Sequence, residues 1–327
     1  MTDESDAKPA AQVELDAQVK PGAQVKPAAK HKKSNALLNV MIAISAIAMI
    51  GALGLIAYPT FSDWWNRMHQ SYAVADYVEQ TKDMSGAERK AMLKAAHEYN
   101  ERLAANGDRW HMTDAQKREY DETLDVTGTG IMGYVTIPRI KVKLPVYHGT
   151  SDGVLQIAAG HLAGTSLPVG GATTHAVVSG HTGLPSARLL TGLDELQKGD
   201  TFAFHVLDET YTYQVDQISV VLPSEISKLN IESGADYATL ITCTPYGVNS
   251  HRLLVRGHRI PNPKVPDKTQ YDEPGEMTAV AAAVIGLLVF VAGCAFVGLA
   301  RLWRRSWIVR HGLCAGAGAR HSSGVRG

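Results

Sequence analysis

The segment TLITCTPYGVNSHR, residues 239–252, combines residue types that are typical of nucleophilic catalysis. It holds Cys243, the only cysteine between two long apolar runs, and Arg252 follows nine positions later. A free cysteine has a pKa of about 8.5 and is only a few per cent thiolate at neutral pH, so a catalytic thiol needs a base or a cation beside it. A buried, inert thiol fits the lone cysteine equally well, and its neighbours must decide between the two.

A histidine is the usual base for such a thiol, and the middle of the chain offers several. His181 stands out because the segment AVVSGHTGLPSA brings it from the end of a β-branched strand into a loop rich in Gly and Pro. Catalytic groups are often placed on loops of this kind. His161, in AAGHL, is the chief alternative for the same role.

Alternating apolar and polar residues predict a β-rich domain around these side chains. Residues 133–149 alternate around two prolines, as short half-buried strands do. Residues 201–223 predict a hairpin that turns at Asp208–Thr210, and residues 236–260 predict a second antiparallel pair. The second pair would end one strand at Cys243 and begin the next at Arg252, so both would meet at one rim. The number of short strands favours a closed β-barrel.

Helical patterns lie between residue 59 and this domain. Apolar residues at positions 64, 65, 68, 72, 75 and 78 are close to helical spacing. Ser85 and Glu88 match the S-x-x-E capping box, so a second helix should begin there and end near Gly107.

Two runs of 23 residues without a charge, at 36–58 and 277–299, flank the region just described. Each is long enough to cross a hydrocarbon core of about 30 Å, and two buried core helices are the less favoured alternative. Basic residues lie outside both runs: Lys30, Lys32 and Lys33 before the first, and Arg301, Arg304, Arg305 and Arg310 after the second. The positive-inside bias therefore predicts cytoplasmic termini, an extracytoplasmic middle and a first run that remains as a signal anchor.

The formal net charge of zero hides an uneven distribution. Residues 1–35 carry six Lys and five acidic residues and repeat the triplet AQV, which predicts a disordered tail. Residues 300–327 carry six Arg and no acid. About seven net negative charges therefore remain on residues 59–276, which argues against nucleic-acid binding.

The segments TLITCTPYGVNSHRLLVRGHR and VVSGHTGLP resemble the sortases, membrane-anchored cysteine transpeptidases of Gram-positive bacteria. The pattern T-L-x-T-C with an arginine nine residues later is specific to that family. The resemblance also includes MGYVTIPRI and LPVYHGTSDGVLQIAAGHLAGTSLPVGG and covers roughly Gly130 to Pro261. Its details resemble class C, the pilin polymerases, which the second apolar run also suits.

The resemblance implies a mainly β fold, an eight-stranded sortase-type β-barrel with N-terminal helices and a lid, flanked by two transmembrane helices. The expected parts are a disordered cytoplasmic tail (1–35), a transmembrane helix (36–58), extracytoplasmic helices and lid (59–129), the catalytic barrel (130–262), a linker (263–276), a second transmembrane helix (277–299) and a basic cytoplasmic tail (300–327).

The resemblance also implies roles for individual residues. Cys243 would be the nucleophile, His181 the general acid or base, and Arg252 the group that positions substrate and stabilises the oxyanion; Thr242 either supports the nucleophile or simply packs beside it. His161 is then expected to be structural, because the family places its catalytic histidine at the later strand end.

The expected partners are pilin subunits with an LPXTG-like sorting signal, an acceptor pilin lysine and the cell membrane. Cleavage between Thr and Gly would leave a thioacyl enzyme, which the lysine amine resolves. This chemistry needs no metal, nucleotide or other cofactor.

Class C sortases carry an N-terminal lid with a D-P-F or D-P-W motif, and NGDRWH offers Asp108 and Trp110 in this role. Arg109 stands where the motif has proline, which frees φ and predicts a looser lid. We expect Asp108 to pair with Arg252 and the Trp110 ring to lie over Cys243. An ordinary helix-ending loop is the alternative.

Three other functions fit parts of the pattern. A sortase that attaches surface proteins to peptidoglycan would use the same three residues with a different amine. A secreted cysteine protease would let water resolve the acyl enzyme, and a noncatalytic pilus scaffold would have an unreactive Cys243. The identity of the product distinguishes these functions.

Overall fold

The structure is a computed structural model that describes residues 36–264 and 285–298 and the single residues 269, 271, 282 and 301. The expected tail at 1–35, nearly all of that at 300–327 and most of the linker at 263–276 lie outside the described residues.

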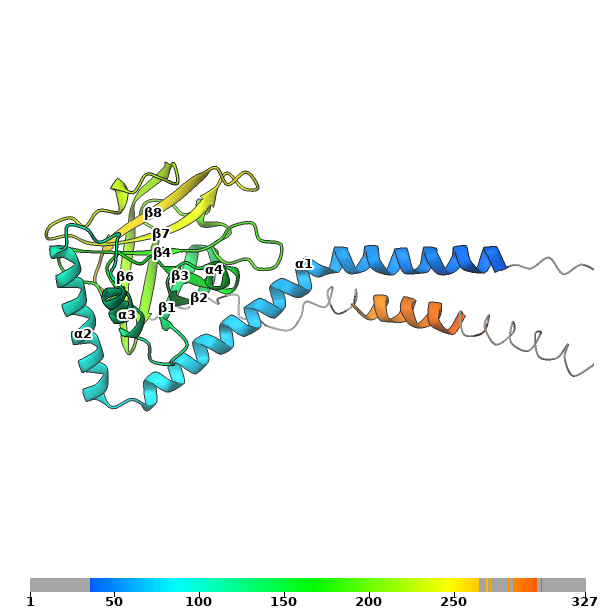
Figure 1. The fold of residues 1–327 in the computed structure, drawn as a ribbon, viewed down its shortest axis with the longest axis horizontal. Coiled ribbons are helices and arrows are strands. Elements are labelled where there is room, and N and C mark those ends of the chain that lie inside the picture. Colours follow the sequence, from blue (N-terminus) through cyan, green and yellow to red (C-terminus); the bar gives the residue numbers. More distant parts are fainter. Residues whose placement is uncertain are drawn as a thin grey trace, which may run out of the picture.

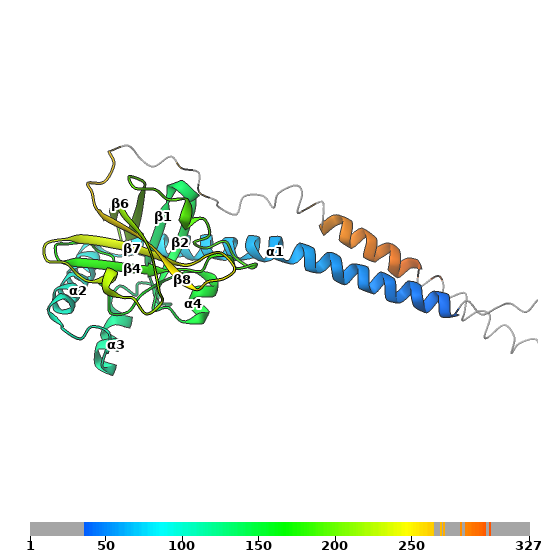
Figure 2. The ribbon, with the colours of Figure 1, turned by 90° about the horizontal axis from the view of Figure 1, so that it is seen from above.

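One helix, α1 (Ala36–Asp83), joins the first apolar run to the helix expected after it. Pro59 lies inside this helix, at the end of the apolar run, and does not end it. In the apolar part the side chains are largely exposed, as a membrane span requires. Within the described residues α1 is the one helix long and apolar enough to cross a membrane, and the helix at Ile285–Gly298, which runs beside its apolar half in both views, is shorter (Figures 1 and 2).

Two further helices lie between α1 and the barrel. Helix α2 (Gly86–Ala105) begins with the predicted capping box, in which the Glu88 N–H donates to the Ser85 hydroxyl and the Ser85 N–H donates to the Glu88 carboxylate. Helix α3 (Asp114–Glu122), which the sequence analysis did not predict, has its own capping box at Thr113 and Gln116. The segment with Asp108 and Trp110 connects α2 to α3.

Eight strands close into a barrel in the order β1-β2-β3-β4-β7-β8-β6-β5, which confirms the predicted architecture (Figure 1). The strands are β1 (Ile131–Ile137), β2 (Val142–His148), β3 (Ala159–His161), β4 (Thr174–Ser179), β5 (Thr201–Val206), β6 (Glu209–Val221), β7 (Asp236–Thr244) and β8 (His251–Arg259). Short helices connect some of them: η1 (Pro138–Ile140), α4 (Asp152–Ile157), η2 (Leu193–Glu195) and η3 (Ser227–Leu229).

Both predicted antiparallel pairs are present. Strands β5 and β6 turn at residues 207–208, one residue earlier than expected, because Val206 pairs with Glu209. Strands β7 and β8 pair from Tyr237 and His258 to Thr244 and His251. Strand β4 lies parallel to β7, and this pairing of distant segments was not predicted.

Helix α1 is fixed to the barrel by the buried side chain of Tyr77. Its hydroxyl donates to the Met132 carbonyl of β1 (3.2 Å) and accepts from the Leu207 N–H (2.7 Å) at the β5–β6 turn. Burial raises the pKa of Tyr77 to about 12, so the hydroxyl keeps its proton and remains a donor at neutral pH. The helix that carries the apolar run is therefore attached to the barrel by hydrogen bonds as well as by packing.

The substitution Tyr77→Phe should destabilise the protein by about 1–3 kcal/mol, because it leaves a buried carbonyl and a buried N–H without their partner. Thermal unfolding of the purified chain should then begin several degrees lower. The exposed Tyr72 on the same helix provides the control, and Tyr72→Phe should leave the unfolding temperature unchanged. Equal unfolding temperatures for the two variants would contradict the attachment described here.

Candidate active site

Cys243 and Arg252 are directly opposite each other on β7 and β8. Paired residues on antiparallel strands point to the same face, with Cβ atoms about 4.5–5.5 Å apart. The nine-residue separation in sequence therefore becomes a contact between neighbours, as the predicted hairpin required. Cys243 is partly buried near the end of its strand, at the rim of the barrel.

His181 reaches the same rim through the parallel pairing of β4 with β7. The last pair in the register is Ser179 with Ile241, and the Gly180 N–H then donates to the Ile241 carbonyl (3.0 Å). His181 and Cys243 each lie two residues beyond that last pair. The loop that follows closes back on the histidine, because the Leu190 N–H donates to the His181 carbonyl (3.1 Å).

Thr242 connects the cysteine strand to the histidine loop. Its side chain is buried, and its hydroxyl donates to the Gly180 carbonyl (2.8 Å). Successive residues of a strand point to opposite faces, so Thr242 does not share the face of Cys243. Its contact supports the residue next to His181 rather than the thiol.

The guanidinium of Arg252 is held by the loop between β7 and β8. Its Nη1 donates to the carbonyls of Asn249 (3.2 Å) and His251 (3.1 Å). Arginine has five N–H donors, and these two bonds involve only one of its three nitrogens. The loop therefore orients the cation with bonds to a single nitrogen.

His161 is fully buried and belongs to the interior of the protein. Its Nε2 lies 2.8 Å from the Ser166 carbonyl, which can only accept, so this nitrogen carries the proton. Its Nδ1 accepts from the Tyr120 hydroxyl (2.9 Å). Burial lowers the pKa of His161 to about 4. These contacts agree with the structural role expected for this histidine.

The expected ion pair between Asp108 and Arg252 is not formed. Asp108 is exposed, and its carboxylate contacts the exposed His111 ring (2.7 Å). Among the described residues, the side-chain partners of Arg252 are the two loop carbonyls above. Asp108 and His111 are both exposed and three residues apart, so they pair readily.

Arg109, which replaces the proline of the lid motif, is the buried residue of this segment, with 8% of its surface exposed. Its Nη1 donates to the Gly164 carbonyl (3.0 Å) in the loop between β3 and β4. Its Nη2 donates to the Leu229 carbonyl (3.0 Å) and to the side-chain oxygen of Asn230 (3.3 Å). Burial lowers the pKa of this guanidinium. The arginine fixes the segment to two separate loops, which is the opposite of the looseness that its sequence position predicted.

Trp110 lies on the barrel face that carries Cys243. It packs against a cluster on that face formed by Val177, Leu229, Ile241 and Leu254. Ile241 and Cys243 are two residues apart on one strand and share this face. The Arg109 guanidinium also lies over the Trp110 ring, 4.4 Å from its centroid.

Sequence reasoning missed three residues of α1 that hold loops at the rim. Asp63 accepts from the Arg188 N–H (2.8 Å), and Asn66 donates to the Ser186 carbonyl (2.8 Å). Gln70 donates to the Ile157 carbonyl (2.7 Å) at the end of α4. The signal was present in the sequence, because positions 63, 66 and 70 fall on one face of a helix that is otherwise rich in aromatic residues.

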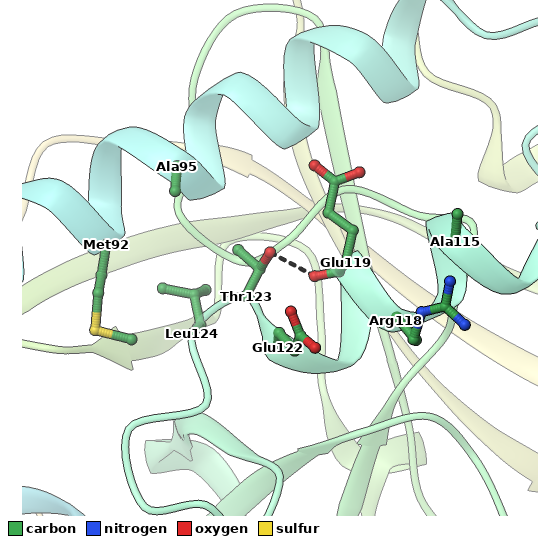
Figure 3. A pocket seen from close by; sticks show the side chains of 8 residues that line it. All are labelled: Met92, Ala95, Ala115, Arg118, Glu119, Glu122, Thr123 and Leu124. Atoms are coloured by element: carbon green, nitrogen blue, oxygen red, sulfur yellow. Dashed lines mark hydrogen bonds between the residues drawn. The ribbon is translucent and has the colours of Figure 1, made fainter.

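A pocket of 470 Å³ between α2 and α3 lies apart from this rim. Figure 3 shows Met92 and Ala95 from α2 facing Ala115, Arg118, Glu119 and Glu122 from α3, with the Thr123 hydroxyl donating to the Glu119 carbonyl. None of the predicted site residues lines it. We therefore place the candidate active site at the rim.

Comparisons with known proteins agree with this fold. The family model for the sortase domain matches residues 135–260. Sortase A of Streptococcus agalactiae is 29% identical over 117 residues, 35% of this chain and 47% of that protein. The match to sortase A of Bacillus anthracis is 27% identical over 149 residues and covers 44% of this chain and 69% of that one. This chain thus spans about half the length of the first of these relatives.

Solved structures give longer matches. Sortase C1 from Streptococcus agalactiae is 52% identical, with a TM-score of 0.58, over 59% of this chain and 100% of that one. Sortase C from Streptococcus pneumoniae is 44% identical, with a TM-score of 0.53, over 60% and 100%. Sortase C from Clostridium perfringens with the C-terminal cell wall sorting motif is 40% identical, with a TM-score of 0.52, over 59% and 100%. The chain belongs to the sortase family, and these neighbours place it in class C.

The buried histidines predict how stability depends on pH. An unfolded histidine binds a proton below about pH 6.5, whereas folded His161 does so only near pH 4. The unfolded chain therefore binds more protons between these values, so stability is full above about pH 6.5 and falls as the pH drops toward 4. A shift of this size corresponds to about 3 kcal/mol.

Chemical denaturation at pH 4.5, 5.5 and 7 should show this loss, and His161→Gln should show a shallower dependence because it lacks that imidazole. Part of the dependence should survive in the variant, because burial also lowers the pKa of His175 to about 4. The interpretation fails if the variant and the unchanged protein have the same slope.

Proposed function

We propose that this protein is a membrane-anchored cysteine transpeptidase that joins pilin subunits covalently. The observation that carries the proposal is the pairing of β7 with both of its neighbours. That pairing brings Cys243 beside Arg252 and places the His181 loop at the same rim. The likeness to class C sortases supports pilins as the substrate class, because sortase C of Streptococcus pneumoniae has pilin substrate specificity.

In the proposed first step, the Cys243 thiolate attacks the carbonyl carbon of Thr in an LPXTG-like signal. Arg252 stabilises the negative charge that develops on the carbonyl oxygen, through the donors on Nε and Nη2. The C–N bond to Gly then breaks, and protonated His181 gives its proton to the departing amine. The products are a thioester on Cys243 and a free Gly amine.

In the second step a lysine amine of another pilin attacks the thioester. Neutral His181 takes the amine proton, the thiolate leaves, and a new amide joins Thr to Lys. Because the thioester keeps the acyl group activated, the energy of the broken amide is retained in the new one.

Membrane attachment through α1 is part of the proposal. The exposed apolar side chains of its first half support it. The expected second span at 277–299 lies partly outside the described residues, and we retain a two-pass arrangement with an extracytoplasmic barrel on the strength of the flanking basic residues.

A sortase that attaches proteins to peptidoglycan is the second candidate, because both curated relatives above are named sortase A. The two functions share the cysteine, histidine and arginine and differ in the amine that resolves the thioester. Trp110 packs on the face that carries Cys243, which supports a lid over the site. A lid is the feature expected of class C sortases, so this packing favours the pilin-joining function.

Cys243→Ala should abolish covalent joining of pilins, and Arg252→Lys should lower kcat roughly 100- to 1,000-fold, as loss of an oxyanion donor does. The exposed Arg118 on α3 is the control, and Arg118→Lys should leave kcat unchanged. The measurement is mass spectrometry of an isopeptide between Thr and Lys after incubation with candidate pilins. A Cys243→Ala protein that still forms this bond would remove the proposed nucleophile, whereas attachment to cell-wall precursors alone would favour the second candidate.

We also propose that residues 106–112 form a lid held shut mainly by Arg109. Arg109→Met keeps most of the side-chain length but loses the hydrogen bonds to Gly164, Leu229 and Asn230. Loss of about 1.5–3 kcal/mol of closed-state stability should raise the open fraction roughly ten- to a hundredfold. Modification of Cys243 by a small thiol reagent should accelerate by that factor, and Trp110→Ala should also accelerate it.

Asp108→Ala is the matched control, because its carboxylate contacts an exposed histidine and should change the rate little. An unchanged rate in folded Arg109→Met protein would show that the segment is only a connection between helices.

A further inference from the structure

Helix α1 ties the active-site rim to the part of the chain that anchors it. Asp63 and Asn66 hold the backbone at Arg188 and Ser186, in the loop that follows His181. Both contacts are side chain to backbone, at 2.8 Å. The position of this loop relative to the apolar run is therefore set by one continuous helix.

The helix also sets the height of the loop above the membrane. An α-helix rises about 1.5 Å per residue, so Asp63 and Asn66 lie about 7.5 and 12 Å beyond Tyr58, where the apolar run ends. A bilayer of about 40–45 Å with a core of about 30 Å leaves roughly 5–8 Å for each headgroup layer. The loop at residues 186–188 thus lies at the outer edge of that layer or a few ångströms beyond it.

Aromatic residues mark the same level on α1. The ring centroids of Phe61 and Trp64 are 5.9 Å apart, and those of Phe61 and Trp65 are 6.2 Å apart. Trp and Tyr are enriched where a helix leaves the hydrocarbon core, because their rings are amphipathic. This cluster lies within one turn of Asp63 and Asn66.

The loop between β7 and β8 lies against the same region. The ring of Tyr246 packs on Gly183, where an added Cβ would come within 2.8 Å of it. Tyr246 and Val248 are 71% and 70% exposed and lie two residues apart on this loop. Both views show the β7–β8 loop directed toward the side from which the apolar half of α1 extends (Figures 1 and 2).

We propose that a rim surface formed by residues 183–190 and 245–250 rests on the outer face of the lipid bilayer, with Tyr246 and Val248 in the interfacial layer. The proposal rests on the membrane anchoring in the proposed function. It extends the proposed function, because the reaction at Cys243 then takes place at the membrane surface. A substrate held in the same bilayer would then meet Cys243 at that height.

Depth can be measured without catalysis. In full-length protein with Cys243→Ala, Cys294→Ala and Cys314→Ala, a polarity-sensitive fluorophore is attached at Val248→Cys. A second sample carries it at Glu209→Cys, which is also exposed but begins β6 at the opposite end of the barrel. Both are reconstituted in phosphatidylglycerol-containing vesicles with spin-labelled lipid near the headgroup. We expect strong quenching at position 248 and none at position 209.

A helical spacer tests whether α1 sets the height. Seven helix-forming residues inserted after Thr60 raise the barrel by about 10.5 Å and turn it by only about 20°, while the contacts of Asp63 and Asn66 are kept. Quenching at position 248 should then fall to the level at position 209. With the three cysteines restored, the spacer variant should lose joining of bilayer-held substrates but keep its turnover of a water-soluble sorting peptide.

Equal quenching at both positions, or quenching at 248 that survives the spacer, would overturn the proposal. So would undiminished joining of bilayer-held substrates by the spacer variant. Failure of the proposed function would look different. The protein without a spacer would then not turn over the soluble peptide, whatever the quenching shows.

Discussion

The arrangement of the rim depends on the register of a single strand. Strand β7 pairs in antiparallel register with β8 and in parallel register with β4, and these two pairings bring Arg252 and the His181 loop to Cys243. A slip of one residue in either pairing would turn the partner side chain to the opposite face of the sheet. The Thr242 hydroxyl bond to Gly180 resists such a slip, because it joins β7 to the residue before His181. A buried threonine thus preserves the geometry that the proposed catalytic side chains need.

The sequence predicted those parts of the structure that local pattern determines. Alternation indicated β7 and β8, and with them the meeting of Cys243 and Arg252 at one rim. The capping box at Ser85 located the start of α2. The parallel pairing of β4 with β7 could not be predicted from the sequence, because it joins segments about 60 residues apart and parallel strands carry no turn signal. The sequence indicated one helix over the apolar run and another after it, whereas the single helix α1 runs through Pro59.

Arg109 shows why a local sequence rule can predict the wrong change in the flexibility of a segment. Replacement of proline frees φ, and the sequence alone therefore predicts a looser segment. The structure supplies three oxygen acceptors from residues 55 to 121 positions away, and the guanidinium bonds to all of them. Local sequence also fails to distinguish His161 from His181. Both follow a glycine, yet His161 is enclosed by Tyr120 and Ser166 whereas His181 lies at the rim, and only the tertiary contacts distinguish them.

Opening of the proposed lid would not require its neighbours to unfold, because each flanking helix has its own attachment to the barrel domain. Asn100 of α2 exchanges two hydrogen bonds with the Leu167 backbone (3.0 and 2.7 Å). Tyr120 of α3 contacts His161 and accepts from the Gly149 N–H (2.9 Å). Release of Arg109 would expose its guanidinium to water, which is an adequate replacement for the carbonyls it leaves. The cost of opening the proposed lid therefore falls on Arg109 and on the packing of Trp110 and Met112, while the barrel register and the position of α1 remain as they are.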